Sequence, residues 1–143
     1  MKSTGRESVL LTGVFCIALA VHLYCATISF RAGFLIGHEF RQAQTAISTY
    51  FIAHDHDYSL AYPTPLLGKP WSIPMEFPLY QWSVAALGNA TGWSLPTAAR
   101  TVSLGCFYLT LPAIFSLLGA WGIARARRLV VLTIVLTSPL YIF

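Results

Sequence analysis

Three ionisable side chains, those of His38, Glu39 and Arg41, follow shortly after an uncharged stretch long enough to cross a bilayer. The chain is 56% hydrophobic and only 10% charged, so charged groups are rare in it. Because charged side chains are costly near hydrocarbon, a cluster of them beside a membrane needs a structural or chemical reason. Glu39 could be a general base, a metal ligand or an acid at a helix start, where the helix dipole favours it. The spacing alone leaves these roles open.

A second group of candidate residues is the alternating run His54, Asp55, His56 and Asp57. These residue types are common metal ligands, but in a polar loop the same run also fits a solvated turn. Glu76 is a lone acid just before an apolar segment, where it could belong to a site or mark the point at which the chain leaves water. The sequence contains no phosphate-cradling glycine-rich loop, Cys-x-x-Cys pair or nucleophile elbow. No motif indicates a cofactor, and a divalent metal ion stays an open alternative.

The elements that must position these residues are long apolar segments. The mean hydropathy is +0.64, and residues 9–30, 101–124 and 129–143 carry no formal charge with His neutral. As a helix the first run would reach about 33 Å, more than the roughly 30 Å of the hydrocarbon core. We therefore predict an all-α integral membrane protein with about three transmembrane helices. A cleavable signal peptide is the alternative for residues 9–30, but their apolar part is longer than signal peptides usually have.

The distribution of charge predicts the orientation of these spans. Residues 1–8 carry two basic side chains and one acid, and residues 125–128 contain three arginines and no acid. Residues 31–100 carry four basic and four acidic side chains. The positive-inside rule therefore predicts a cytoplasmic N-terminus, an external loop over residues 31–100 and a second cytoplasmic segment at 125–128. Because most of the excess positive charge flanks apolar runs in this way, the net charge of +4 does not indicate nucleic-acid binding.

The external loop is expected to contain juxtamembrane helices. Apolar residues recur at three- and four-residue intervals from His38, which predicts an amphipathic helix that ends near residues 53–54. A segment rich in Pro, Gly and Ser follows it. Residues 77–93 are a shorter apolar segment, which we interpret as an interfacial helix; a further membrane crossing is the alternative. Asn89-Ala90-Thr91 matches a glycosylation sequon, a tripeptide that is common by chance.

Three segments carry a resemblance to a known family. Glu39 follows His38 at the start of the predicted external helix, residues 76–82 read EFPLYQW, and residues 98–103 read AARTVS. This order resembles the GT-C membrane glycosyltransferases of the protein-O-mannosyltransferase and aminoarabinose-transferase type, which include relatives classed as glycosyltransferase family 39-like. In that family the first external loop opens with Asp-Glu, has a Pro-Pro-Leu-Tyr-Tyr-Trp-like segment and continues with Ala-Ala-Arg. Here His38 stands in place of the Asp, and Phe77 in place of the first proline.

The resemblance spans residues 9–143 and implies the N-terminal part of a GT-C-type helical bundle. It also implies a hexosyl- or pentosyl-type transferase in a bacterial inner membrane. Family members transfer a sugar from a polyprenyl-phosphate donor to a lipid, glycan or protein acceptor at the outer face, as in lipopolysaccharide or protein glycosylation. Glu39 is then the candidate base or acceptor-orienting acid, with His38 beside it. The substrate-binding candidates are Arg41, Lys69, Glu76, Tyr80 and Arg100, of which Lys69 and Arg100 would offset charge on the leaving phosphate.

The family pattern includes further spans and a second acidic residue beyond the third span. The resemblance therefore implies that residues 1–143 are an N-terminal fragment of a longer transferase, which alone is not expected to retain activity. Two other classes stay open. One is a small non-enzymatic membrane protein, such as a translocation partner for lipid-linked sugars. The other is a transport subunit in which Glu39 and Arg41 line a polar path.

Overall fold

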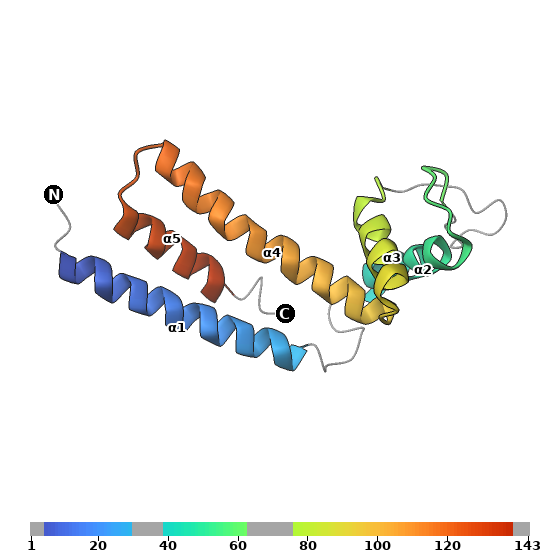
Figure 1. Cartoon of the computed structure of the whole chain (residues 1–143), viewed down its shortest axis with the longest axis horizontal. Helices are drawn as coiled ribbons and strands as arrows, with labels where there is room; N and C mark the ends of the chain where they lie inside the picture. The colour runs from blue at the N-terminus through green and yellow to red at the C-terminus, as the bar shows by residue number, and fades with distance from the viewer. Residues whose placement is uncertain (1–4, 30–38, 63–75, 139–143) are drawn as a thin grey trace. The chain divides into compact units, whose positions relative to one another are not determined.

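The computed structural model describes residues 5–29, 39–62 and 76–138 (Figure 1). Within these ranges the chain forms helices and no strand, which confirms the predicted all-α class. The helices are α1 (Gly5–Ser29), α2 (Glu39–Asp55), α3 (Leu79–Thr91), α4 (Leu95–Ala120) and α5 (Arg125–Thr137). They belong to two compact units. The first contains α1, α5 and α4 from Cys106 onward, and the second contains α2, α3 and α4 up to Gly105.

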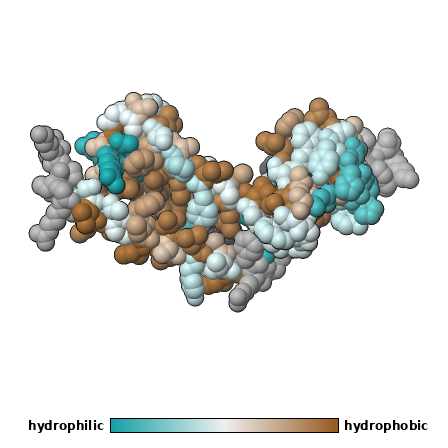
Figure 2. Space-filling model, in the orientation of Figure 1, coloured by the Kyte–Doolittle hydropathy of each residue, from teal (hydrophilic) through white to brown (hydrophobic). Residues whose placement is uncertain are grey.

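Two of the helices, α1 and α4, are long and apolar enough to cross a bilayer by length and composition. The most apolar 18-residue window has a mean hydropathy of 2.2 within Glu7–Ile28 and 1.8 within Leu95–Ala120. Apolar surface is correspondingly widespread on the face of these helices shown in Figure 2. For the predicted third span, residues 129–143, α5 provides 13 described helical residues from Arg125, which reach about 20 Å. Residues 139–143, the last five of the predicted span, lie outside the described ranges, so the third span stays a prediction.

The bounds of α4 differ from the predicted span of residues 101–124 because local capping sets them. At the start, the Ser94 hydroxyl accepts a hydrogen bond from the Thr97 N–H at 3.4 Å, the role of an N-cap side chain. At the end, Gly122 adopts φ +74°, and the N–H groups of Gly122 and Ile123 bond back to carbonyls of the last turn. The helix therefore includes Arg100 in its second turn and stops before Trp121.

The first unit is held by a stripe of leucines on α5. Leu129, Leu132 and Leu136 recur at spacings of three and four residues, and all three are buried. Leu132 and Leu136 pack with Ala18 of α1 and Leu111 of α4. Helices α1 and α5 lie side by side and begin at the same end of this unit, while α4 runs in the opposite direction (Figure 1).

Polar side chains in the apolar helices of this unit find partners within the protein. His22 of α1 is 3% exposed, and its Nδ1 lies 2.9 Å from the hydroxyl of Tyr108 on α4. The His22 ring also stacks on Phe107, with 4.8 Å between the ring centroids. The hydroxyls of Thr12 and Thr110 donate to backbone carbonyls of their own helices at 2.8 and 2.6 Å. These contacts satisfy groups that would be costly to leave unpaired in hydrocarbon.

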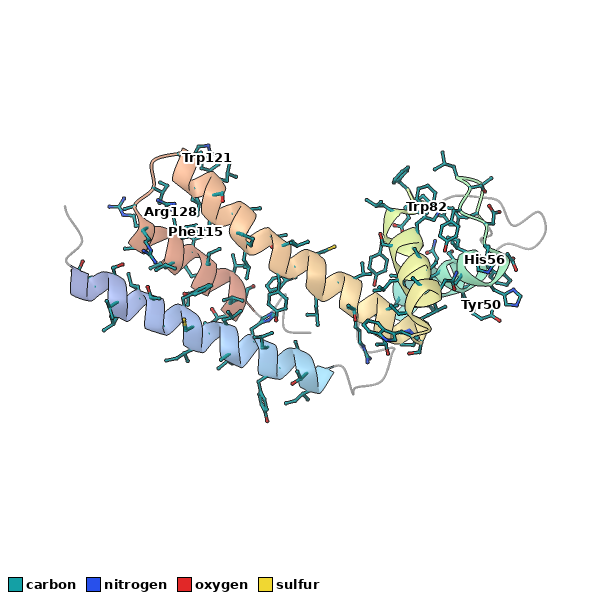
Figure 3. All side chains as sticks on the ribbon, in the orientation of Figure 1. Tyr50, His56, Trp82, Phe115, Trp121 and Arg128 are labelled. Atoms are coloured by element: carbon teal, nitrogen blue, oxygen red, sulfur yellow. The ribbon has the colours of Figure 1, made fainter. Side chains whose placement is uncertain are left out.

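Arg128 fixes the turn between α4 and α5. Its Nε donates to the Ile123 carbonyl at 2.7 Å, and its guanidinium carbon lies 4.8 Å from the centroid of the Phe115 ring. Figure 3 shows Phe115, Trp121 and Arg128 together at this turn. A Cβ atom on Gly119 would lie 2.6 Å from an Arg128 guanidinium nitrogen, so a larger residue there would displace the end of the Arg128 side chain.

The second unit has its own apolar core between α2 and α3. Ile52, Ala53, Tyr62 and Ala85 are buried there, and Trp82 and Leu95 pack against them. The predicted helix from His38 to residues 53–54 is confirmed, within two residues, as α2. The apolar segment 77–93 is helical as α3, whose 13 residues reach about 20 Å. This length is below the roughly 30 Å of a hydrocarbon core and favours an interfacial helix over a crossing.

Ile52 and Ile47 offer a matched test of this core because they lie on the same helix with different burial. Ile52 is 0% exposed and Ile47 is 37% exposed. We expect Ile52→Ala to lower the free energy of unfolding by about 2–5 kcal/mol, because it leaves a cavity between α2 and α3. Ile47→Ala should cost less than about 1 kcal/mol. Thermal unfolding in detergent, followed by circular dichroism, measures both; equal losses would contradict the assignment of the core.

Candidate functional site

The residues proposed for catalysis lie at the start of α2. Glu39 is the first residue of this helix and Arg41 its third. An acid at this position is favoured by the helix dipole, in agreement with one of the roles open from the sequence. His38 and Lys69 lie outside the described residues, as do the side chains of Glu39 and Arg41. The chemistry assigned to these four residues therefore stays a prediction.

Glu76 belongs to a hydrogen-bonded group at the entry to α3. Its Oε1 accepts a hydrogen bond from Gln81 Nε2 at 2.8 Å, and its backbone carbonyl accepts one from the Tyr62 hydroxyl at 2.9 Å. Gln81 and Tyr62 are 2% and 1% exposed, so two buried side chains hold one exposed acid in place. The Oε1 of Gln81 is also buried and has no hydrogen-bond partner among the described residues. The group therefore presents a fixed carboxylate, which can accept hydrogen bonds from hydroxyl groups.

Tyr80 joins the two motifs that are separate in the sequence. Its hydroxyl lies 3.2 Å from the Ala99 carbonyl oxygen, to which it donates, and 3.1 Å from the Ser103 hydroxyl. The EFPLYQW segment at the start of α3 is thus in contact with the AARTVS segment on α4. Arg100, which follows Ala99, is half-buried on α4, close in sequence to this contact. Tyr80 is 37% exposed, so part of its side chain remains accessible to solvent.

The run of potential metal ligands at the end of α2 is used for local hydrogen bonds. His54 Nδ1 lies 2.8 Å from Asp55 Oδ1, and both side chains are exposed. The backbone N–H of Ser59 donates to Asp57 Oδ1 at 2.9 Å, and this bond, together with one from the Ser59 side chain, holds the pKa of Asp57 below its ordinary value. Among the described residues, no three His, Cys, Asp or Glu side chains come together in a way that could hold a metal ion.

Asn89 connects the end of α2 to α3. Its Nδ2 donates to the Ala53 carbonyl at 3.1 Å and lies 3.3 Å from His56 Nδ1 and 3.4 Å from the Tyr58 hydroxyl. His56 has φ +54°, a left-handed conformation that is uncommon for residues other than glycine, and it directly follows α2. Because Nδ2 is the atom that glycosylation would modify, a glycan on the sequon at Asn89 would disturb this connection.

A groove of about 270 Å³ lies at the C-terminal ends of α2 and α3 and is open to solvent. Tyr50 and His54 line it from α2, Asn89 from α3, and Gly92 and Trp93 from the turn that follows. The sequence analysis did not identify this groove, because its lining comes from two segments, residues 50–54 and 88–95, that are far apart in the sequence. The local signal for the groove in the sequence was Gly92 followed by Trp93. Gly92 ends α3 with φ +71°, and the large Trp93 side chain that follows this turn is 47% exposed.

Comparison of the chain with protein-family models, with curated proteins and with solved structures finds no match in any of the three.

The contact made by Tyr80 can be tested by removing its hydroxyl alone. We expect Tyr80→Phe to lower the free energy of unfolding by about 1 kcal/mol or less, because the group is partly exposed and bonds at just over 3 Å. Ser103→Ala should cost less, since it leaves the bond to the Ala99 carbonyl. Tyr50→Phe is the matched control on an exposed tyrosine. Additive losses in the Tyr80→Phe, Ser103→Ala double variant would contradict a direct contact between the two side chains.

Proposed function

We propose that this chain is the N-terminal part of a GT-C-type glycosyltransferase. In this proposal the full-length transferase moves a sugar from a polyprenyl-phosphate donor to an acceptor at the outer face of a bacterial inner membrane. The observation that carries the proposal is the contact of Tyr80 with Ala99 and Ser103, which brings together the second and third motifs of the resemblance.

The helical arrangement supports the proposed topology. Two helices have the length and composition to cross a bilayer, and α3 is too short to do so. In the first unit, α1 and α5 begin at the same end (Figure 1). The basic residues at the start of these two helices, Arg6 on α1 and Arg125, Arg127 and Arg128 on α5, therefore lie on one side, as the positive-inside rule requires of cytoplasmic segments. The loop of residues 31–100 is then external, where the donor's sugar is presented.

The proposed reaction forms a bond between an acceptor hydroxyl oxygen and the anomeric carbon of the sugar. The bond between that carbon and the donor phosphate oxygen breaks, and polyprenyl phosphate leaves as an anion. Glu39 takes the acceptor proton, with His38 beside it, as a general base. The cationic side chains of Lys69 and Arg100 offset charge on the leaving phosphate, and Arg41 is a further substrate-binding residue. Glu76, fixed by Gln81, accepts hydrogen bonds from substrate hydroxyls, and Tyr80 borders the same region.

Glu39→Gln tests the catalytic assignment. In the full-length transferase we expect this substitution to lower the rate of sugar transfer by about 10²–10⁴-fold, because the amide cannot accept the proton. Membrane insertion and expression should not change. Glu7→Gln, on an exposed acid of α1, is the control and should transfer sugar normally. The rate is measured with a radiolabelled polyprenyl-phosphate sugar in membranes; a turnover unchanged in Glu39→Gln would exclude the proposed role.

Cysteine labelling tests the topology separately. In a variant in which Cys16, Cys25 and Cys106 are replaced by alanine, Ser59→Cys should react with an impermeant maleimide added outside intact cells. Ser59 is exposed in the second unit, so the reagent can reach it. Ala124→Cys, in the turn before α5, should react only after the membrane is opened. The reverse pattern would show that the proposed orientation is inverted.

A further inference from the structure

The groove at the C-terminal ends of α2 and α3 combines exposed aromatic side chains with polar groups and is open to solvent. Its walls include two large aromatic side chains that the protein leaves accessible, with Tyr50 53% and Trp93 47% exposed. Small-molecule sites typically combine apolar and aromatic walls with a few polar groups that fix orientation. Here His54 and Asn89 provide those polar groups.

The polar groups of the groove are held by neighbouring residues. Asn89 Nδ2 is bonded to the Ala53 carbonyl at 3.1 Å, which fixes the plane of the amide. His54 Nδ1 is bonded to Asp55, which leaves Nε2 as the ring nitrogen available to a ligand. The His54 ring also stacks on Tyr50, with 5.8 Å between centroids and 24° between planes. Figure 3 shows Tyr50 projecting from the end of α2.

We propose that this groove binds one sugar ring of the acceptor, at a position remote from the reacting hydroxyl. A pyranose ring has an apolar face of C–H groups that packs on aromatic rings, and hydroxyls at its edge that bond to imidazole and amide groups. The groove is open to solvent and its volume of about 270 Å³ lies below the roughly 300–1,000 Å³ of pockets that enclose drug-sized molecules, so it would hold one ring at the surface and not enclose a larger ligand. The proposal rests on the proposed function for the identity of the ligand as a sugar.

The length of α2 indicates which sugar the groove would take. Glu39 begins this helix and His54 lies 15 residues later, a separation of about 22 Å along the helix axis. A ring in the groove is therefore too far from Glu39 to be the one that reacts. It belongs to an acceptor that carries more than one sugar unit, and its contacts would position the acceptor rather than take part in bond formation.

Direct binding is tested by saturation-transfer NMR on the chain in nanodiscs, with the methyl glycosides of mannose, galactose and N-acetylglucosamine as probes. We expect transfer to at least one glycoside, and at least a tenfold loss of affinity in Trp93→Ala. Trp121→Ala removes another exposed tryptophan, on the first unit, and should leave binding unchanged. Circular dichroism confirms that each variant is folded, and Tyr50→Ala provides a second groove variant if Trp93→Ala is not. Absence of transfer to every probe with folded protein would overturn the proposal.

Lipid contact is the competing explanation for Tyr50 and Trp93, because aromatic side chains are common at membrane interfaces. Nanodiscs with brominated lipids separate the two. The fluorescence contributed by Trp93 is the difference between the unchanged chain and Trp93→Ala. We expect this contribution to be insensitive to brominated lipid and sensitive to added sugar. Quenching of this fluorescence by brominated lipid, with no response to sugar, would overturn the proposal.

Kinetics with the full-length transferase separate this inference from the proposed function. Trp93→Ala should raise KM for the acceptor with little change in kcat, whereas Glu39→Gln should leave glycoside binding intact while transfer is lost. A rise in KM for the donor alone would overturn the assignment to the acceptor. Sugar binding without any transferase activity would contradict the proposed function and leave the groove as a sugar site.

Discussion

The apolar surfaces of α1 and α4 constrain the rest of the molecule, because the described chain covers so little of them. Within their most apolar stretches, 11% of the residues of α1 and 6% of those of α4 are buried. Apolar surface exposed to water costs roughly 25 cal/mol per Å², so helices of this kind are stable only where hydrocarbon or another apolar surface covers them. In hydrocarbon it is the polar groups that are costly to expose, so each of them needs a hydrogen-bond partner within the protein. The hydrogen bond between His22 of α1 and Tyr108 of α4 provides such a partner for both side chains.

The second unit is stabilised in a different way. Its helices are shorter and less apolar, and α2 and α3 bury Ile52, Tyr62 and Ala85 between them. The polar ends of this core are closed by long-range hydrogen bonds, from the Tyr62 hydroxyl to the Glu76 carbonyl and from Asn89 to the Ala53 carbonyl. These bonds tie both ends of α3 to other parts of the unit. Such a unit can remain folded at a membrane surface, where water is available to its exposed side chains.

The local features of this architecture could be predicted from the sequence. The uncharged run at residues 9–30 and the apolar periodicity after His38 correspond closely to α1 and α2, because both signals arise from residues within one helix. Capping was less predictable. Ser94 and Gly122 set the ends of α4, whereas hydropathy placed the ends of this helix at the limits of the uncharged run. The distribution of charge was enough to predict an orientation, because the positive-inside rule uses the number of basic residues in each segment and no tertiary contact.

The contacts of the candidate site could not be predicted in the same way. Tyr80 and Ser103 are 23 residues apart, and Asn89 and Ala53 are 36 apart, so no local pattern relates them. The groove depends on the same long-range packing. Side-chain types did identify Glu76 as a candidate, but the buried amide of Gln81 that holds it became apparent only from the fold. Residue chemistry thus marks candidates, while packing decides which of them are fixed.

The geometry of α3 keeps the two parts of the candidate site independent. Tyr80 and Asn89 are nine residues apart on this helix, a distance of about 14 Å along the axis, and about two and a half turns place them on opposite faces. One face meets α4 through Tyr80, and the other meets the end of α2 through Asn89. Substitutions at separations above about 7–10 Å without shared partners usually have additive effects. The helix therefore acts as a rigid spacer, and a change in the side-chain contacts at one end is not expected to disturb those at the other.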